Sequence, residues 1–333
     1  MSKEIVVSGI RSTGLLHLGN YLGAIRNYVR MQEDFDCFFF VADYHSLTTH
    51  PDPKDLRASV YRVLAENIAS GLEPEKVTLY AQSDLHEIPE LYLLMNTLAY
   101  KGELEKVPTF KDKVRSQPQN VNAALLTYPV LMAADILIHR ATKVPVGKDQ
   151  EQHLEMARNF AGRFNARYGT ELFPEPQAFN FGEELIKVPG LDGGAKMSKS
   201  ENGAGTIYLA DEDDALRKKI MKAKTDATPT EENMPVPESV ANLLMLLELV
   251  SGPDAGKPYL QAWADRSIRF GDLKKELAEA MVTFITPIRE RAAELQKDEA
   301  YLQKVLREGA EKAHVSAGKT LQLARESVGI RYY

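Results

Sequence analysis

The chain carries a cluster of side chains suited to an anion at residues 187–203, which read KVPGLDGGAKMSKSENG. Two lysines and two serines gather there: Lys196, Ser198, Lys199 and Ser200. No apolar period of 3.6 or 2 residues runs through the stretch, which predicts a loop. Glycines let such a loop bend closely around a ligand, and lysines favour a negatively charged one. The alternative interpretation is a solvated linker.

A second candidate site follows the first predicted strand, where the sequence reads VVSGIRSTGLLHLGN. His17 and Asn20 stand at the predicted start of a helix. In an open parallel sheet, ligands bind beyond the carboxyl ends of the strands, where free N–H groups of a helix can contact phosphate. The spacing is not G-x-G-x-x-G, and the chain has no P-loop motif. A helix cap or a packing residue is the alternative interpretation of His17.

The elements that must position these side chains fall into two groups. Strands are predicted at 4–10, 36–43, 77–83 and 143–147, and helical patterns between them at 19–33, 53–70, 87–100, 121–134 and 149–168. This alternation predicts an α/β domain with a parallel sheet covered by helices. From Asp211 onward the strand signals end, and helical patterns occupy 211–224, 237–250, 272–296, 299–313 and 316–327. An all-helical domain is therefore predicted after the lysine–serine loop.

Composition narrows the class of protein. With 333 residues, 44% hydrophobic and 26% charged, the chain is expected to form two packed units with a large core. Its single cysteine, Cys37, lies in an apolar run and is expected to be buried and inert. The sequence shows no signal-peptide pattern and no long apolar span, so a cytoplasmic location without membrane association is expected. The net charge of −6 neither indicates nor excludes binding of nucleic acid, because a local basic face can bind it.

The two candidate sites together resemble the paired signatures of one enzyme family. HLGN at 17–20 resembles the HIGH signature of class I aminoacyl-tRNA synthetases, and KMSKS at 196–200 is identical to their second signature. TYPVLMAADIL at 127–137 and VPVGKDQEQHLEMARN at 144–159 are similar to the tryptophanyl and tyrosyl branch. The resemblance covers nearly the whole chain, and tryptophanyl members are the closest match. It implies a Rossmann-like parallel-sheet nucleotide-binding domain with a C-terminal all-helical domain.

The resemblance also implies a role for each domain. Residues 1–205 would form the catalytic domain, with a helical insertion around 101–140 and the KMSKS loop at 196–200. Residues 206–297 would bind the anticodon, and the helices of 298–333 would pack back on the catalytic domain. The family is usually homodimeric, so a homodimer is expected.

In the first reaction of this family, the amino-acid carboxylate attacks the α-phosphate of ATP and pyrophosphate leaves. Catalysis of such transfers is mostly positioning and stabilisation of charge, for which Lys196 and Lys199 are suited, with His17 and Asn20 from the first signature. Mg²⁺ is expected on the ATP phosphates, held mainly by the nucleotide and water. The implied ATP-binding residues are Arg11, Ser12, Thr13, Gly19, Asn20, Gly147, Lys148, Asp149, Val188, Lys196, Met197, Ser198, Lys199 and Ser200.

Two of these segments depart from the family pattern. GIRSTG stands where many members have GIQPSG, and GKD stands where they have GED. Arg11 therefore brings a charge that suits phosphate, and Lys148 replaces an acid with a base. Asp149 begins a predicted helix, where N-capping is an equally good explanation.

The amino-acid substrate is predicted from TYPVLMAAD, in which Tyr128, Met132 and Asp135 fall on one helix face. Tyrosyl members resemble Y-x-x-x-Q-x-x-D here, whereas this chain has a methionine, whose thioether suits a broad aromatic ring. An ionised Asp135 can accept the indole N–H of tryptophan. The predicted tryptophan-binding residues are Gly9, His45, Tyr128, Met132, Asp135, Val144, Val146 and Gln150. The alternative makes Tyr128 and Met132 core residues and pairs Asp135 with Arg140 or Lys143.

The second reaction would transfer L-tryptophan to the 3′ end of tRNA(Trp). Basic residues within 101–115 and 217–224 are candidates for the tRNA surface, and a solvated helix face is the alternative. Three other functions stay open: a tyrosyl-tRNA synthetase, a non-acylating paralogue that binds an amino acid or tRNA, and a nucleotidylyltransferase of the same superfamily. Intact HLGN and KMSKS segments argue against a pure binding protein.

Overall fold

A computed structural model of the chain describes residues 3–12, 14–147, 150–179, 187–194, 197 and 205–333. The chain divides into two compact units. The first unit comprises residues 1–14, 28–182 and 296–333, and the second comprises 15–27 and 183–295.

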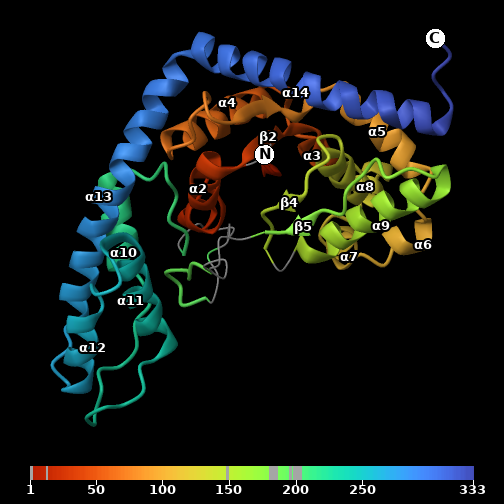
Figure 1. The fold of residues 1–333 in the computed structure, drawn as a ribbon. Coiled ribbons are helices and arrows are strands. Elements are labelled where there is room, and N and C mark those ends of the chain that lie inside the picture. Colours follow the sequence, from red (N-terminus) through yellow and green to blue (C-terminus); the bar gives the residue numbers. More distant parts are fainter. Residues whose placement is uncertain (1–2, 13, 148–149, 180–186, 195–196, 198–204) are drawn as a thin grey trace. The chain divides into compact units, whose positions relative to one another are not determined.

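A five-stranded parallel sheet forms the centre of the first unit, in the order β3-β2-β1-β4-β5. Figure 1 labels β2, β4 and β5 of this sheet. The strands are β1 Ile5–Arg11, β2 Asp36–Ala42, β3 Thr78–Ala81, β4 Lys143–Val144 and β5 Gln177–Ala178. The predicted α/β class with its parallel sheet is confirmed. Strand β5 was not predicted, because two exposed residues carry no periodic pattern.

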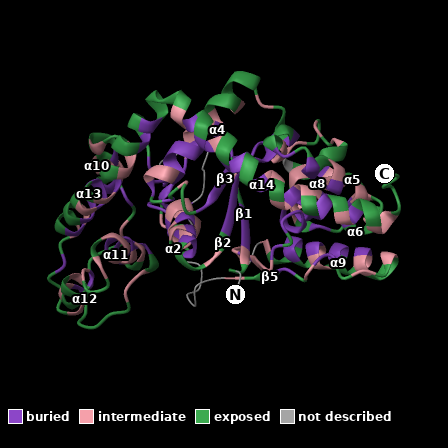
Figure 2. Cartoon of the chain, turned by 45° about the horizontal axis from the view of Figure 1, so that its top comes forward, coloured by how far each residue is buried: buried purple, intermediate pink, exposed green. Residues whose placement is uncertain are grey.

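Helices complete the first unit. They are α3 Asp43–Ser46, α4 Pro53–Ala69, α5 Glu87–Asn96, α6 Lys101–Leu104, α7 Pro108–Ser116, α8 Ala123–Leu137, α9 Glu151–Tyr168 and α14 Glu299–Val328, with 3₁₀ turns at Leu47–Thr49 and Gln82–Asp84. The main core joins the sheet to α5, α8, α9 and α14, with Phe38, Phe40 and Phe160 among its buried residues. Figure 2 shows buried residues along the strands and on the inner faces of these helices.

Helix α14 is one continuous helix, so the predicted break between 313 and 316 is wrong. Its buried residues Ala310, Ala313, Ala317, Leu321 and Ala324 recur every three or four positions without interruption. Because that spacing keeps one face of the helix against the core, the exposed β-branched Val315 does not end it. The helix packs against β3 and α5.

The second unit is helical after Asp211. It contains α1 Leu18–Asn20, a π-helical turn at Tyr21–Ile25, α10 Asp213–Met221, α11 Glu238–Ser251 and α12 Lys257–Ala264, and most of α13 Phe270–Lys297; α2, Arg26–Asp34, continues from the π-helical turn. The predicted all-helical C-terminal part is confirmed. Helix α12 was not predicted, because its sequence follows a glycine- and proline-rich stretch. No helix within the described residues is long and apolar enough to cross a membrane.

Candidate active site

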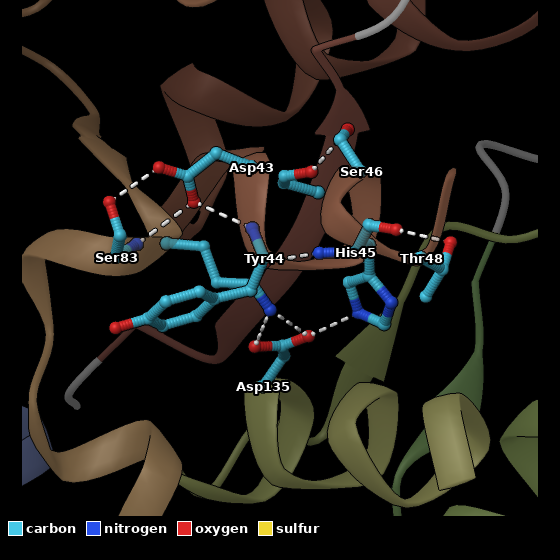
Figure 3. A network of polar contacts seen from close by, with 9 residues as sticks. Asp43, Tyr44, His45, Ser46, Thr48, Ser83 and Asp135 are labelled. Carbon is cyan, nitrogen blue, oxygen red and sulfur yellow. Dashed lines mark hydrogen bonds and ion pairs between the residues drawn. The ribbon is translucent and has the colours of Figure 1, made fainter. Parts of the chain in front are cut away.

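A polar cluster surrounds the carboxylate of Asp135 in the first unit (Figure 3). Gln82 Nε2 donates to both carboxylate oxygens, at 2.8 and 2.9 Å. His45 Nε2 lies 3.0 Å from Asp135 Oδ2. Asp135 is 1% exposed and Gln82 is fully buried. The carboxylate therefore has the donors that a buried acceptor requires.

Three elements bring these side chains together. Strand β2 ends at Ala42, and His45 lies in α3, which follows directly. Gln82 follows β3 directly, and Asp135 lies on α8. The carboxyl ends of neighbouring parallel strands meet at one edge of the sheet, where ligands bind in open α/β folds. The His45 N–H donates to Gln82 Oε1 at 3.4 Å, which joins the two strand ends.

Asp43 holds the backbone next to this cluster. Its Oδ1 accepts the backbone N–H groups of Tyr44 at 2.9 Å and Ser83 at 3.0 Å, and its Oδ2 accepts the Ser83 hydroxyl. Thr48 Oγ1 donates to the His45 carbonyl at 2.9 Å. Figure 3 shows these contacts holding both sides of the His45 segment. The 3₁₀ turns at Leu47–Thr49 and Gln82–Asp84 thus hold the backbone of the His45 segment, while the His45 ring lies against Asp135.

The Asp135 carboxylate retains acceptor capacity. Each carboxylate oxygen has two lone pairs. Oδ2 accepts from Gln82 and lies within hydrogen-bond distance of His45, whereas Oδ1 accepts from Gln82. Burial raises the pKa of Asp135, and hydrogen bonds from His45 and Gln82 oppose that shift. The predicted alternative pairing is not seen between these described residues: Arg140 donates to the Leu172 carbonyl, and Lys143 lies 3.3 Å from Glu4.

Tyr128 and Met132, the other predicted pocket residues of α8, differ in their surroundings. The Tyr128 hydroxyl lies 2.7 Å from His153 Nε2 and also contacts the Thr109 hydroxyl. Burial raises the pKa of Tyr128. Met132 is half-buried and packs against the main core. The hydroxyl of Tyr128 is therefore committed to protein partners, while Met132 as a residue stays half-buried.

The remaining predicted pocket residues lie along the sheet and at the start of α9. Gly9 is exposed on β1 and pairs in register with Phe40. Val144 is the buried last residue of β4, and Val146 packs at the edge of the main core. Gln150 is the half-buried N-cap residue of α9.

The first signature, HLGN, forms a closed turn in the second unit. The Asn20 N–H donates to His17 Nδ1 at 3.2 Å, and the His17 N–H donates to Asn20 Oδ1 at 3.1 Å. This is a capping box at the start of α1. A Cβ on Gly19 would lie 2.9 Å from His17 Nδ1, so a larger residue would displace the ring. His17 therefore caps the helix, and its predicted contact with ATP stays a prediction.

The second unit also brings the two signatures together. The Leu18 N–H donates to the Ile207 carbonyl at 2.8 Å, and the Leu209 N–H donates to the Leu16 carbonyl at 2.9 Å. Within the second signature, Met197 is 2% exposed and its N–H donates to the Val188 carbonyl at 2.6 Å. A Cβ on Gly19 would stand 3.7 Å from the Met197 Cβ. Segments far apart in the sequence are thus neighbours.

Two other predicted ATP-binding residues lie in the described part of the first unit, and seven predicted site residues do not lie in the described part of the chain. Ser12 is buried, with its hydroxyl 2.8 Å from the Ser46 hydroxyl, and Gly147 is half-buried. Seven predicted site residues lie outside the described part of the chain: Thr13, Lys148, Asp149, Lys196, Ser198, Lys199 and Ser200.

Arg11 and Lys113 place two positive charges near Tyr128 in the first unit. Lys113 Nζ lies 4.5 Å from the centroid of the Tyr128 ring. Burial, and secondly the charge of Arg11, lower the pKa of Lys113 to about 8. Lys113 belongs to the predicted tRNA surface, but its half-buried ammonium faces the Tyr128 ring. Two close positive charges favour an anion between them.

The other predicted tRNA surface, at 217–224, is partly neutralised by the protein itself. Arg217 Nε donates to Glu279 at 2.7 Å, and Lys219 Nζ lies 2.7 Å from Asp211. These two cations are therefore less available to a polyanion than the sequence implies.

The family of this chain follows from comparison over its length. The family described as tRNA synthetases class I (W and Y) matches residues 2–286. The chain belongs to this family. The resemblance drawn from HLGN and KMSKS is thereby confirmed, and so is the assignment to ATP-dependent aminoacyl-tRNA synthetases.

Individual members of this synthetase family are similar over the full chain. Tryptophan–tRNA ligase of Porphyromonas gingivalis is 57% identical over 328 residues, which are 98% of this chain and 100% of that one. Tryptophan–tRNA ligase of Rickettsia bellii is 42% identical over 330 residues, with 98% and 99% covered. The tryptophanyl-tRNA synthetase of Campylobacter jejuni, solved in complex with ADP and tryptophan, has a TM-score of 0.86 at 34% identity, with 98% and 99% covered.

Three polar residues of this synthetase were missed by sequence reasoning. Gln82 and Asp43 each follow a buried strand directly, and a polar residue at that place is a usable signal in a parallel sheet. Lys113 was grouped with neighbouring lysines by composition. The position of Lys113 against the Tyr128 ring depends on how α7 packs against α8. A local sequence pattern does not predict that packing.

Proposed function

We propose that the chain is a tryptophan–tRNA ligase. It activates L-tryptophan with ATP to tryptophanyl-adenylate and pyrophosphate, and then transfers tryptophan to the 3′ end of tRNA(Trp). The observation that carries this proposal is the 57% identity to a tryptophan–tRNA ligase across 98% of the chain. The buried Asp135 cluster supports it independently.

Asp135 is the proposed acceptor for the substrate's indole N–H. Its donors Gln82 and His45 hold the carboxylate in one orientation and leave acceptor capacity on Oδ1. The indole N–H is a donor without an acceptor of its own, so it complements that oxygen. The polar hydrogen of tyrosine is on a hydroxyl outside the ring, whereas the indole N–H of tryptophan is part of the ring system. A buried acceptor left without its donor costs free energy, which is the proposed basis of selection.

The proposed pocket around the ring uses the partly accessible Met132, with Gly9, Val144 and Val146 from the sheet. Tyr128 is proposed to act through its ring, because its hydroxyl is committed to His153. Gln150, at the start of α9, is proposed to contact the polar end of the amino acid.

For ATP, we propose contacts from His17, Gly19, Asn20, Val188, Met197 and the lysines and serines of KMSKS. Arg11, Ser12 and Gly147 remain predicted contacts with ATP from the family resemblance, and we add Lys113 as a candidate beside Arg11. A phosphate near Lys113 would offset the burial and the Arg11 charge that lower its pKa. These cations would stabilise the negative charge that passes to pyrophosphate.

Mg²⁺ is proposed to enter as part of the MgATP substrate. It prefers oxygen ligands in octahedral geometry and keeps several waters. Among the described residues, the one cluster of three potential ligands includes two histidines, which does not suit Mg²⁺. Nucleotide oxygens and water are therefore the proposed ligands. Because its substrates are ATP and tRNA, we also propose a cytoplasmic location.

The test is amino-acid-dependent exchange of pyrophosphate into ATP across all twenty amino acids. Tryptophan should drive exchange, and tyrosine and phenylalanine should hardly do so. Faster exchange with tyrosine would make the protein a tyrosyl enzyme. Exchange with none of them would leave a non-acylating binding protein. Charging of tRNA(Trp), followed on the same preparation, tests the second reaction.

A homodimer is the proposed assembly, on the basis of the family alone. Light scattering at micromolar concentration should give twice the mass of the 37.2 kDa chain. A monomer mass at that concentration would contradict it.

A further inference from the structure

Three side chains with metal-binding atoms meet where α5 begins beside α14. His86 and Glu87 stand at the start of α5, and His314 lies on α14. His314 Nδ1 lies 2.9 and 3.0 Å from the two oxygens of Glu87, and His86 Nε2 lies 3.7 Å from Glu87 Oε1. The imidazole rings of His86 and His314 are 4.9 Å apart. None of these residues belongs to the proposed tryptophan or ATP sites.

The two separations that involve Glu87 are close to the edges of a coordination tetrahedron. Bonds of about 2.0–2.1 Å from Zn²⁺ to nitrogen or oxygen imply ligand atoms about 3.3–3.4 Å apart. The measured separations of 2.9–3.7 Å bracket that value, and the three ligand atoms lie within 4.8 Å of one another. The Glu87 side chain is 7% exposed and the His86 side chain is 82% exposed. The buried Glu87 side chain is thus held in place by its surroundings, whereas the exposed His86 side chain can rotate to complete the site.

An ion pair between His314 and Glu87 is the simpler explanation of part of this arrangement. It does not account for the second imidazole, which has turned its Nε2 toward the same carboxylate oxygen. Both Glu87 oxygens face a single nitrogen of His314, and one N–H cannot point well at two acceptors. A cation shared by the three groups would use one lone pair from each imidazole and one from the carboxylate.

We propose that His86, Glu87 and His314 bind a divalent transition-metal ion, with Zn²⁺ as the best fit. Two imidazoles and one carboxylate are a known ligand set for four-coordinate Zn²⁺, and water would take the fourth position on the exposed side. Imidazole ligands select Zn²⁺ over Mg²⁺, which prefers oxygen. The ion would tie the start of α5 to α14.

The test of the site is the zinc affinity of the full chain. The protein is prepared without a histidine tag and freed of metal with a chelator. Competition with a chromophoric chelator should show one Zn²⁺ per chain. His86→Ala removes an exposed ligand without breaking the His314–Glu87 pair, and should weaken binding at least about tenfold. His50→Asn is the matched control: His50 is exposed, and asparagine tolerates its positive φ of 49°. Equal affinity of His86→Ala and parent would overturn the proposal.

Thermal unfolding separates metal binding from folding. Without metal, His86→Ala and parent should melt at the same temperature, because an exposed side chain contributes little packing. Zn²⁺ in excess should raise the melting temperature of the parent and of His50→Asn by about 2–5 °C, and that of His86→Ala hardly at all. Mg²⁺ should raise none of them through this site. A Zn²⁺ shift of the same size in His86→Ala would contradict the site. Its failure would leave the tryptophan–tRNA ligase assignment intact, because pyrophosphate exchange is measured separately.

Discussion

Asp135 illustrates how a buried carboxylate depends on its neighbours. Both of its oxygens accept hydrogen bonds, and burial nevertheless raises its pKa. Gln82, which follows the end of β3, supplies two of these bonds. A buried group of this kind is costly to keep unless it serves stability or recognition, and here the free acceptor capacity favours recognition.

Replacing Asp135 with asparagine should impair selection of the amino acid. The amide keeps the size but turns an N–H toward the donors of Gln82 and His45. We expect kcat/KM for tryptophan in pyrophosphate exchange to fall about 10- to 100-fold, with a smaller preference over tyrosine. The KM for ATP should change less than about threefold. Asp55→Asn, at an exposed position of α4, is the control. An unchanged preference for tryptophan would exclude Asp135 as the selecting acceptor.

His139 should make folding sensitive to acid. Its Nε2 lies 2.9 Å from the Tyr80 hydroxyl, and its ring stacks on Phe38. Burial lowers its pKa from 6.5 to about 3. Between these values the unfolded chain binds a proton that the folded chain does not. The contribution of the neutral ring is therefore complete above about pH 6.5 and is lost as pH falls, by at most about 1.4 kcal/mol per unit.

The variant His139→Gln tests this origin of the pH dependence. The measured quantity is the slope of the free energy of unfolding against pH between about pH 4.5 and 6. That slope should be smaller in the variant than in the parent, whatever the loss in absolute stability. His50→Asn should keep the parental slope. Identical slopes in His139→Gln and parent would assign the acid sensitivity to other groups.

At the scale of elements, helix α14 covers the edge of the sheet. Strand β3 is an edge strand, and Gly309 of α14 lies directly against it. A Cβ on Gly309 would stand 1.7 Å from the Leu79 carbonyl oxygen. Covering an edge strand in this way prevents it from pairing with another chain. Helix and strand can approach so closely only because residue 309 has no side chain.

Gly309→Ala should therefore destabilise the protein by at least about 2 kcal/mol, because the added methyl forces α14 away from β3. Gly318→Ala, in the same helix, is the matched control. Its Cβ would meet only Glu87 Oε1, at 3.7 Å. Alanine there should stabilise the helix by about 0.5–1 kcal/mol. Thermal unfolding should move the two midpoints in opposite directions. If Gly309→Ala melted at or above the parental temperature, the close packing would be wrong.

At the scale of the whole molecule, the proposed chemistry divides along the chain. The residues proposed for activation all precede Asp211, whereas the segment from Asp211 to Lys297 is helical and carries no phosphate-binding motif. We propose that this segment serves tRNA. Internal pairing of Arg217 with Glu279 and of Lys219 with Asp211 reduces its free charge. Recognition by shape and by base contacts is therefore expected to matter more there than charge alone.

Anticodon substitutions in the cognate tRNA test this division. They should slow charging and leave pyrophosphate exchange at its normal rate, because exchange needs only tryptophan, ATP and pyrophosphate. A substitution in the acceptor stem serves as the comparison. Charging that is insensitive to the anticodon would remove the proposed role of the helical segment.

The sequence by itself determined the family, the order of the elements and the change from α/β to all-helical structure. Each rests on a local signal: the HLGN and KMSKS motifs, and apolar periodicities that survive whatever packs against them. Cys37 is another case. An apolar run predicted its burial, and the structure bears this out, because Cys37 is fully buried. Burial raises the pKa of its thiol to about 12.

The tertiary structure alone decided which side chains meet. His45 and Gln82 contact Asp135 from positions 90 and 53 residues away, and Met197 lies near Gly19. It also made α14 continuous and added the short β5, where local signals were absent or misleading. The physical reason is that periodicity reports which face of an element is buried. The partner of a buried polar group is set by how elements distant in sequence pack together.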